Sequence, residues 1–471
     1  MMWVHSFISH FKKIILFAVV VVTVTKVMNY LYVDDTDDFV RYGIHAFYEE
    51  RENIDRLYLG SSHVYCGVNP VILDGINGEN NFNLATSWQQ LNTSYYLLKE
   101  ADKRHHIDRV CLDLYYACVT DGVGNVHDDS EISNSWVVLN QMRPSLNKLV
   151  YMLDLSSPQY YYMTFLPFMR YKEELFDQEY IAEIVGRKRS DVWKNYEYRH
   201  SSAEGRYVRA NGEKGFCIYY GAPDHGRFYT MQEWPTLKKN PITRESLEYL
   251  RKIVEYCEQH DIALTWIGVP SSDFLLLLNG RYDNFFNQVT ELSRQYDIPY
   301  YDFNLCRREY LDVSEMEYWS DMGHLNTYGA EVFTKFLGEF LLSQEMEEGI
   351  PADCFYNSYE EKISDMPDEI YGLVITVAEE DKFCMTDIPE DQKEKYISYR
   401  IRPVSNAGEN SVSFAVSVTT GGDFGEEKKV PVIQDGNDAY ITVSTDESGV
   451  MNIQAELKTS GEVMNWVGIE Y

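Results

Sequence analysis

The stretch Ile54-Asp55-Arg56-Leu57-Tyr58-Leu59-Gly60-Ser61-Ser62-His63 places two serine hydroxyls directly after a short apolar run. A second stretch, Ser320-Asp321-Met322-Gly323-His324-Leu325, places a carboxylate and an imidazole three positions apart, just before a helix-like segment. A serine is a poor nucleophile at neutral pH until a base takes its proton, and that base works best when an acid fixes its tautomer and orientation. The two stretches together contain the side chains of a nucleophilic site.

Outward from the first stretch, short apolar runs alternate with segments of helical periodicity. The clearest helix has Thr243 as its predicted N-cap and an apolar stripe from Leu247 to Cys257. Such alternation predicts an α/β fold, in which a doubly wound parallel sheet has helices on both faces and forms three layers. The predicted strands lie at 54–60, 81–85, 107–115, 262–270 and 299–303, and the other predicted helices at 89–105, at 284–296 and after 325.

The predicted sheet would bring the two stretches close together. In parallel sheets of this kind, ligands bind outside the carboxyl ends of the strands. Ser61 and Ser62 follow the first predicted strand, and Asp321 and His324 lie in the loop that leads into the last helix. One edge of the sheet can therefore hold all of these side chains.

The N-terminus carries the membrane signal of this chain. Lys12 and Lys13 precede an apolar segment of 20 residues, 14–33, which is about the length that a bilayer core requires. Four aspartates follow within residues 34–38, so the charge pattern predicts a cytoplasmic N-terminus and an exported remainder. We favour an uncleaved anchor over residues 1–35, because no small-x-small cleavage site follows the apolar run. A cleaved signal peptide and a buried soluble helix are the alternatives.

The alternating pattern between 36 and 350 is interrupted from about 116 to 239. This region is rich in aromatic residues and holds the basic cluster Arg187-Lys188-Arg189. We interpret it as a mostly helical insertion, which either forms a lid over a substrate cleft or simply packs over the sheet. The tail, 351–471, instead has short, partly alternating runs separated by turn-rich pieces, which predict a small antiparallel β-sandwich that contacts glycans or acts as a spacer.

Composition narrows the possible partners. The 471-residue chain has a formal charge of −32, which argues against binding to nucleic acid. None of its eight cysteines forms a C-x-x-C pair, so a zinc ribbon is not expected; buried thiols and disulfides both remain open. Asp-rich loops in the tail match no EF-hand spacing. We therefore predict no metal and no cofactor.

These motifs resemble the SGNH (GDSL-like) hydrolases, and most closely their membrane-anchored, cell-envelope branch of DltD-like proteins and polysaccharide O-acyltransferases. The resemblance spans roughly Asp55 to Leu342, without the insertion. It implies that Ser62, the last residue of Gly60-Ser61-Ser62, is the nucleophile, and that Asp321 and His324 complete the triad. A strand-ending Gly-Ser-Ser with a distal Asp-x-x-His before a C-terminal helix is moderately specific.

The chain departs from the family pattern at the oxyanion hole. The region 83–87 has Ala85 where the family has glycine, and Tyr115 stands where its asparagine is expected. An alanine still has an N–H, and the N–H of Ser62 is a further expected donor, but losing one preorganised donor can lower turnover by roughly two to three orders of magnitude. We assign Ala85, Ser87, Tyr115 and His63 to oxyanion or substrate binding.

Two side chains near the motifs have simpler interpretations. His63 could touch substrate or a second carboxylate, but a packed histidine at the start of a helix is the commoner case. Asp113 could be catalytic, but a structural carboxylate bonded to backbone N–H groups is more usual.

The sequence therefore predicts a membrane-anchored, extracytoplasmic serine esterase or O-acyltransferase. Its expected partners are an acylated envelope glycan or acyl donor, together with a membrane acyltransferase and the membrane itself. Hydrolysis and transfer stay open, because they differ only in whether water or a sugar hydroxyl intercepts the acyl-enzyme. One alternative is a non-catalytic SGNH-fold protein for envelope assembly or glycan binding, and another is a lipase-like esterase with a greasy cleft.

Overall fold

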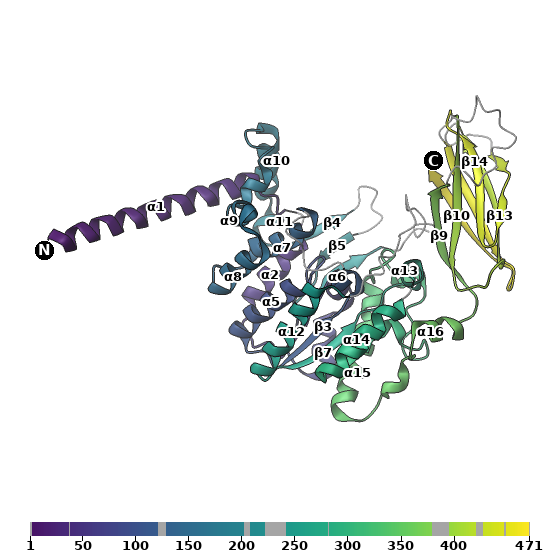
Figure 1. The fold of residues 1–471 in the computed structure, drawn as a ribbon, viewed down its shortest axis with the longest axis horizontal. Coiled ribbons are helices and arrows are strands. Elements are labelled where there is room, and N and C mark those ends of the chain that lie inside the picture. The colour runs from purple at the N-terminus through teal and green to yellow at the C-terminus, as the bar shows by residue number, and fades with distance from the viewer. Residues whose placement is uncertain are drawn as a thin grey trace.

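The computed structural model describes residues 2–36, 38–120, 129–201, 208–221, 242–280, 282–378, 395–420, 427–446 and 449–470. Figure 1 shows three parts in chain order, which are a long N-terminal helix, a central α/β body and a C-terminal all-β unit. The central body holds both motif stretches. The turn-rich piece at 421–423 and Cys384 lie outside the described residues.

The central body is built on a five-stranded parallel sheet. All five predicted strands are present, each a little shorter than its apolar run, and the order across the sheet is β2-β1-β3-β7-β8. The fold class α/β is therefore confirmed. The strands are β1 (Arg56–Leu59), β2 (Asn81–Asn83), β3 (Arg109–Asp113), β7 (Ala263–Gly268) and β8 (Tyr300–Asp302).

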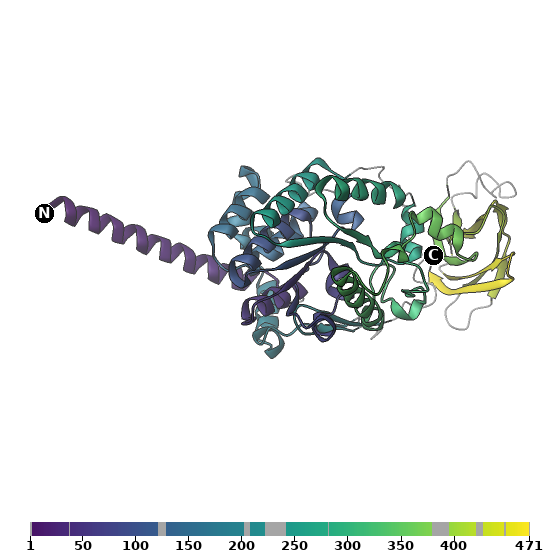
Figure 2. The same cartoon turned by 90° about the horizontal axis from the view of Figure 1, so that it is seen from below.

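Alternate residues of the strands supply two separate cores, one on each face of the sheet. Leu57 and Leu59 point into the first core, whereas Tyr58 points into the second, as the two-residue period of a strand requires. Figure 2 shows helices on both sides of the sheet. The first core is covered by α5 (Leu91–His105), α12 (Arg244–Gln259) and α14 (Tyr282–Tyr296), and the second by α3 (Ser62–Gly67), α4 (Pro70–Asn77) and α15 (Thr327–Met346).

The predicted start of α12 is confirmed by its cap. Thr243 has extended backbone angles, and its side-chain oxygen accepts the N–H of Ser246 at 3.2 Å. This bond satisfies one of the N–H groups that a helix leaves without a partner in its first turn.

The segment that follows the apolar N-terminus forms a helix that we did not predict. Helix α2 (Phe39–Glu49) is capped by Asp38, which accepts the N–H of Val40 at 2.9 Å. Its apolar side chains Ile44 and Phe47 are buried in the first core. The helix has only 11 residues, which is too short for its helical period to be clear in the sequence.

The insertion contains strands as well as helices, which extends the predicted mostly helical character. Its helices are α6 (Tyr116–Thr120), α7 (Asp129–Gln141), α8 (Leu146–Leu155), η1 (Pro158–Tyr160), α9 (Tyr161–Phe165), η2 (Pro167–Tyr171), α10 (Gln178–Lys188) and α11 (Asp191–Lys194). A three-stranded antiparallel sheet follows, in the order β4 (Arg199–Ser201), β5 (Val208–Asn211) and β6 (Cys217–Tyr220).

The C-terminal unit consists of two four-stranded antiparallel sheets that share one core. Ile401 and Ile441 from one sheet pack with Val416 and Ile453 from the other. The first sheet has the order β13 (Ile433–Asp435), β14 (Asp438–Ser444), β10 (Tyr396–Ser405) and β9 (Ile370–Val377). The second has the order β12 (Glu427–Val430), β11 (Val412–Thr420), β15 (Gly449–Leu457) and β16 (Glu462–Glu470).

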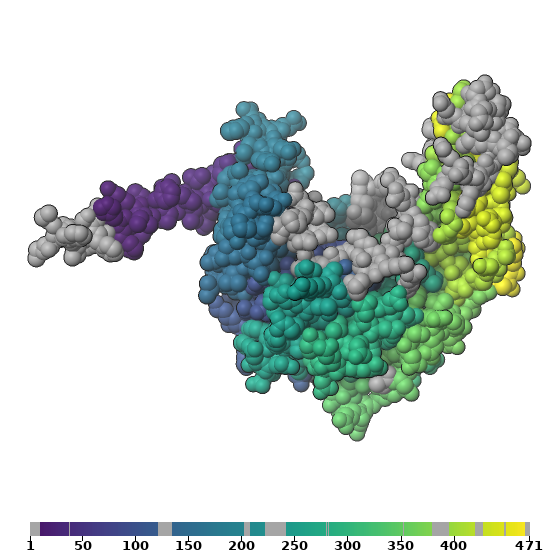
Figure 3. Space-filling view, viewed as in Figure 1, coloured from purple at the N-terminus to yellow at the C-terminus, as the bar shows by residue number. Residues whose placement is uncertain are grey.

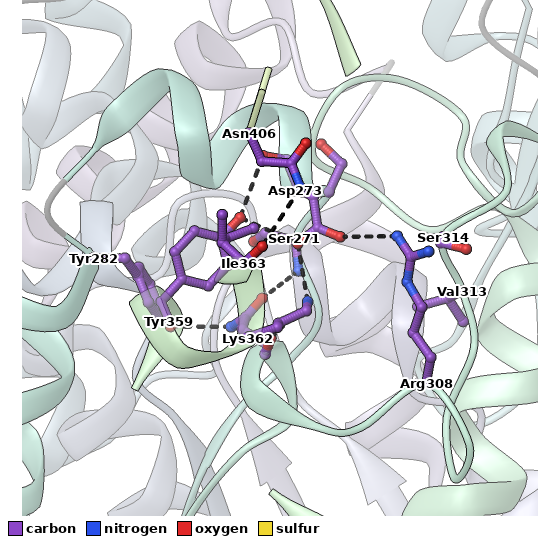
Figure 4. A network of polar contacts seen from close by, with 12 residues as sticks. Ser271, Asp273, Tyr282, Arg308, Val313, Ser314, Tyr359, Lys362, Ile363 and Asn406 are labelled. Carbon is purple, nitrogen blue, oxygen red and sulfur yellow. Dashed lines mark hydrogen bonds and ion pairs between the residues drawn. The ribbon is translucent and has the colours of Figure 1, made fainter. Parts of the chain in front are cut away.

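A buried polar network joins the central body to the segment that leads into this unit (Figure 4). Asp273, at the start of α13 (Asp273–Asn279), accepts bonds from Lys362 at 2.9 Å and from Tyr359 at 3.1 Å, both in α16 (Tyr359–Asp365). Arg308 lies 3.9 Å from Asp273 and 3.3 Å from Glu369, just before β9. These contacts tie the chain on either side of α16 to the central body. The remaining short helices are η3 (Phe303–Leu305), η4 (Met316–Tyr318) and η5 (Ala352–Cys354).

The N-terminal helix α1 (Met2–Tyr32) extends away from the body in both views (Figures 1 and 2). Among the described residues it is the one helix long and apolar enough to cross a membrane, over His10–Tyr32, with a mean hydropathy of 2.1. Its apolar stretch is exposed, whereas its last residue, Tyr32, is buried against the body. At 1.5 Å per residue this span is about 34 Å long, against about 30 Å for a bilayer core. Asn29 lies near the end of α1 that meets the body, and its side-chain oxygen accepts the N–H of Phe168 at 3.0 Å.

Candidate active site

Three side chains from the two motif stretches form one hydrogen-bonded line. The Oγ of Ser62 lies 2.7 Å from Nε2 of His324, and Nδ1 of His324 lies 2.9 Å from both carboxylate oxygens of Asp321. An ionised carboxylate only accepts, so Nδ1 carries the ring proton and Nε2 is free to accept the serine proton. This is the geometry of a nucleophile, a general base and an orienting acid.

The turn between β1 and α3 positions Ser62. Gly60 has a φ of +155°, and a Cβ added there would lie 2.5 Å from Cγ2 of Val64 and 2.6 Å from Cβ of Asp113. Only glycine fits this close approach. Ser61 is buried, and its Oγ accepts the N–H of His63 at 3.3 Å as the N-cap of α3, so Ser62 is the serine of the pair that faces the imidazole.

The loop before α15 positions the acid and the base. Trp319 and Leu325 pair across it, and both the N–H and the Oγ of Ser320 donate to the carbonyl of His324, at 2.9 and 3.0 Å. Oδ1 of Asp321 accepts the N–H groups of Gly323 and His324, both at 2.9 Å. The loop backbone therefore holds the carboxylate beside the ring.

These contacts also keep Asp321 charged. Burial alone would raise its pKa, but the His324 ring and the two backbone N–H groups stabilise the carboxylate and lower its pKa below the ordinary value. Asp321 is therefore ionised wherever a folded protein of this kind would be assayed.

His63 is packed against the site as a neutral ring. It is buried, stacks on Tyr115 with ring centroids 4.0 Å apart, and lies 4.8 Å from the His324 ring. Burial, with a smaller contribution from His324, lowers the pKa of His63 to about 3. This placement agrees with the packed interpretation of His63.

Replacing His63 by phenylalanine should make the free energy of unfolding fall less between pH 7 and pH 5. The unfolded chain protonates this histidine near pH 6.5 and the folded protein only near pH 3, so wild-type stability falls as pH decreases between these values. Between pH 7 and pH 5 we expect a loss of about 2 kcal/mol that the His63→Phe variant avoids. Urea unfolding at both pH values measures it, and equal losses in both proteins would contradict it.

Ala85, Ser87 and Tyr115, which we assigned to oxyanion or substrate binding, each make a different contact. The N–H of Ala85 donates to Oδ1 of Asn83 at 3.2 Å, so its proton is used in a local turn rather than at the nucleophile. The Oγ of Ser87 lies 3.2 Å from the hydroxyl of Tyr65 in α3. Tyr115 contributes its ring, which stacks on His63.

The backbone N–H of Ser62 is a hydrogen-bond donor close to the Ser62 hydroxyl. Ser62 is the first residue of α3, where a helix has no earlier carbonyl to accept its N–H. Asn83 supports this helix by donating its side-chain amide to the carbonyls of Val64 and Val68, both at 2.9 Å.

Asp113 has the structural role that we considered the more usual one. Its Oδ1 accepts the N–H of Val269 at 3.1 Å, which links the ends of β3 and β7. Burial raises its pKa to about 7. Its Cβ also packs against Gly60, so it helps to shape the turn before Ser62.

Sequence reasoning missed two side chains that reach the site from the insertion. The hydroxyl of Tyr219 in β6 lies 3.5 Å from Oδ2 of Asp321, and it accepts a 2.8 Å bond from Arg209 in β5. The backbone of Tyr219 is fixed by Thr327 at the start of α15, which accepts its N–H at 2.9 Å and donates to its carbonyl at 3.1 Å. No motif marks these residues, because they lie about a hundred positions before Asp321.

The C-terminal unit also lies beside the site. Met322, in the middle of the Asp-Met-Gly-His loop, packs with Val374 of β9 and Val404 of β10. The carbonyl of Met322 accepts the hydroxyl of Ser272. The loop that carries the base is thus contacted by the body on one side and by the β-sheet unit on the other.

The described residues contain no group of three or more His, Cys, Asp or Glu side chains arranged to hold a metal ion. The groups that the structure places at Ser62 are its hydroxyl, the His324 imidazole, the Asp321 carboxylate and nearby backbone N–H groups. Such a set suits acyl transfer.

Comparison with known proteins gives no family assignment. No family model matches the chain, and no curated protein matches it. A two-domain esterase (CEX) active on acetylated mannans, co-crystallised with mannopentaose, is 10% identical, with 90% of this chain and 91% of that chain covered and a TM-score of 0.25. A double mutant of the Cellulomonas fimi endo-β-1,4-mannanase is also 10% identical, with 93% and 99% covered and a TM-score of 0.14. At these TM-scores neither likeness carries an argument about this chain.

Proposed function

We propose that this protein is an SGNH-type serine esterase or O-acyltransferase, anchored by α1 and acting outside the cytoplasm on acyl esters of a cell-envelope glycan. The observation that carries the proposal is the 2.7 Å contact between Ser62 Oγ and His324 Nε2, with Asp321 at 2.9 Å from the far ring nitrogen. The glycan and the envelope rest on the motif resemblance to the DltD-like branch and on the apolar span of α1.

The proposed reaction has two steps. The Oγ of Ser62 attacks the ester carbonyl while His324 takes the serine proton, and the ester bond breaks as His324 returns that proton to the leaving alkoxide. Water or a sugar hydroxyl then attacks the acyl-enzyme, again losing its proton to His324, which hands it to Ser62 Oγ as the new product leaves. Asp321 stabilises the imidazolium in both steps, and the N–H of Ser62 faces the developing oxyanion.

A fluorophosphonate probe tests the proposal directly, because it labels only activated serines. We expect stoichiometric labelling of the wild-type protein and none of Ser62→Ala. The matched control is Ser61→Ala, which removes the adjacent capping hydroxyl and should keep the label. Labelling that survives in Ser62→Ala but disappears in Ser61→Ala would reject Ser62 as the nucleophile.

A non-catalytic glycan-binding or assembly role is the second candidate, and one observation favours it. The N–H of Ala85 is used by Asn83, and no asparagine replaces the missing oxyanion donor near Tyr115. If well-folded wild-type protein takes no label, this second role is the better assignment. If the wild-type protein is labelled, rates on acetylated sugars and on long-chain esters separate a glycan enzyme from a lipase-like one.

A further inference from the structure

Helix α8 carries two apolar stripes on opposite sides, one buried and one exposed. Tyr151 and Leu155 point into the body and are buried. The opposite face carries four aliphatic side chains at the i, i+3, i+4 and i+7 positions of one helical stripe, and they are exposed to solvent: Leu146, Leu149, Val150 and Leu153. An exposed apolar patch of this kind is typical of a surface that contacts protein or lipid.

The next α-helix, α9, packs against α8 and carries exposed aromatic side chains. Tyr162 and Phe165 of α9 are also exposed, and we call the six residues of α8 and α9 together the α8–α9 face. Phe165 lines a cavity of 320 Å³ whose other wall is formed by Asn29 and Tyr30 of α1. The α8–α9 face therefore reaches the end of the proposed membrane anchor at Phe165.

The anchor and the insertion are held together by specific contacts, so their relative position is defined. Lys188 of α10 donates to the carbonyls of Val33 and Tyr30, the latter at 3.1 Å. Trp193 of α11 donates to Asp35 at 3.1 Å, and Arg187 pairs with Asp34 at 3.0 Å. Figures 1 and 2 both show α1 leaving the end of the body at which the helices of the insertion lie.

Charge makes this part of the surface different from the rest. Residues 145–195 contain seven basic and seven acidic side chains, whereas the whole chain carries −32. An anionic leaflet would repel most of the protein but not this segment. Exposed Tyr and Phe side chains next to aliphatic ones are also the composition of a membrane–water interface.

We propose that the α8–α9 face inserts into the interfacial layer of the outer leaflet, as a second membrane contact beside α1. Apolar side chains of helices that lie in the plane of the membrane reach about 5–10 Å into the boundary between headgroups and acyl chains. The inference rests on the proposed anchoring by α1. It adds that the central body is held against the bilayer in one orientation instead of swinging on a single helix.

Three matched valines test this contact in the full chain. Val150 in the α8–α9 face and Val71 on α4 are both 43% exposed, and Val21 in α1 is 40% exposed. Each is changed to cysteine, labelled with a nitroxide, and placed in nanodiscs of phosphatidylcholine and phosphatidylglycerol with one chain per disc. Collision rates with oxygen and with a water-soluble nickel chelate then report lipid or water around each label. The seven described native cysteines are buried, and the labelled wild-type chain gives the background.

We expect the oxygen-to-nickel collision ratio at Val150→Cys to exceed that at Val71→Cys several-fold and to approach that at Val21→Cys. A ratio at Val150→Cys equal to that at Val71→Cys, with Val21→Cys in lipid, would overturn the inference and leave the anchor in place. Shielding of the Val150→Cys label from both reagents would indicate contact with protein and would also overturn it. A water-exposed Val21→Cys would remove the anchor and this inference together, whereas serine labelling would still test the chemistry.

Discussion

Replacing Asp321 by asparagine is expected to lower kcat on an ester substrate by about 10⁴-fold while the protein stays folded. Oδ1 of Asp321 accepts both loop N–H groups, so the amide oxygen of asparagine must take this position. The amide NH₂ then replaces Oδ2, 2.9 Å from Nδ1 of His324, and donates to it. The ring proton moves to Nε2, which can no longer accept the proton of Ser62.

The measurement is kcat and KM at neutral pH, with circular dichroism as the check on folding. Asp312→Asn is the matched control, because Asp312 lies on the same connection between β8 and α15 but is exposed and bonds only to Ser314 in the structure. It should retain wild-type kcat. Since the pKa of Asp321 is lowered, this carboxylate should stay ionised above about pH 5, and its protonation should not reduce wild-type activity there. A fall of less than about tenfold in Asp321→Asn would contradict a base that depends on it.

Replacing Gly60 by alanine should cost about 4 kcal/mol of folding free energy and abolish activity even at temperatures where the variant folds. The new methyl group would lie 2.5 Å from Val64 and 2.6 Å from Asp113, at a φ of +155° that alanine rarely adopts. Either Val64 must move, which shifts the start of α3, or the strand end must move. Both movements displace Ser62 from Nε2 of His324.

Chemical denaturation and the fluorophosphonate label measure the two effects separately. Gly75→Ala is the matched control, because Gly75 lies in α4 with open space around its Cβ position. It should leave labelling unchanged and stabilise the protein by roughly 0.5–1 kcal/mol, the usual helix preference for alanine. Wild-type stability and labelling in Gly60→Ala would show that the turn is less constrained than its contacts indicate.

Local patterns in the sequence predicted the elements of the central body well. The cap at Thr243 and the apolar runs that became β1, β3 and β7 depend on contacts within a few residues or on burial on both faces of a sheet. In the C-terminal unit the same patterns predicted an antiparallel β-sandwich, and the structure has two antiparallel four-stranded sheets there. Helix α2 was missed because its pattern is short and its apolar face is completed only by the core it enters.

The candidate site also has one part that the sequence predicted and one part that it did not. The hydrogen-bonded line of Ser62, His324 and Asp321 was predictable because each of its two stretches carries its own local signal, and because parallel strands bring their carboxyl ends to one edge. The contact from Tyr219 and Arg209 to Asp321 was not, since it depends on how a separate small sheet packs on α15. The use of the Ala85 N–H by Asn83 was equally invisible, because a one-residue difference in turn geometry redirects that proton.

By itself, then, the amino-acid sequence determined the five strands of the central sheet, the apolar N-terminus and the three side chains Ser62, His324 and Asp321 that form one hydrogen-bonded line. Each of these depends on side-chain chemistry or on periodicity over a short stretch of chain. Only the tertiary structure decided which N–H groups remain near the nucleophile, which residues support Asp321, and that an apolar stripe of α8 is left uncovered beside α1. Those properties arise from packing between distant segments, and no single segment encodes them.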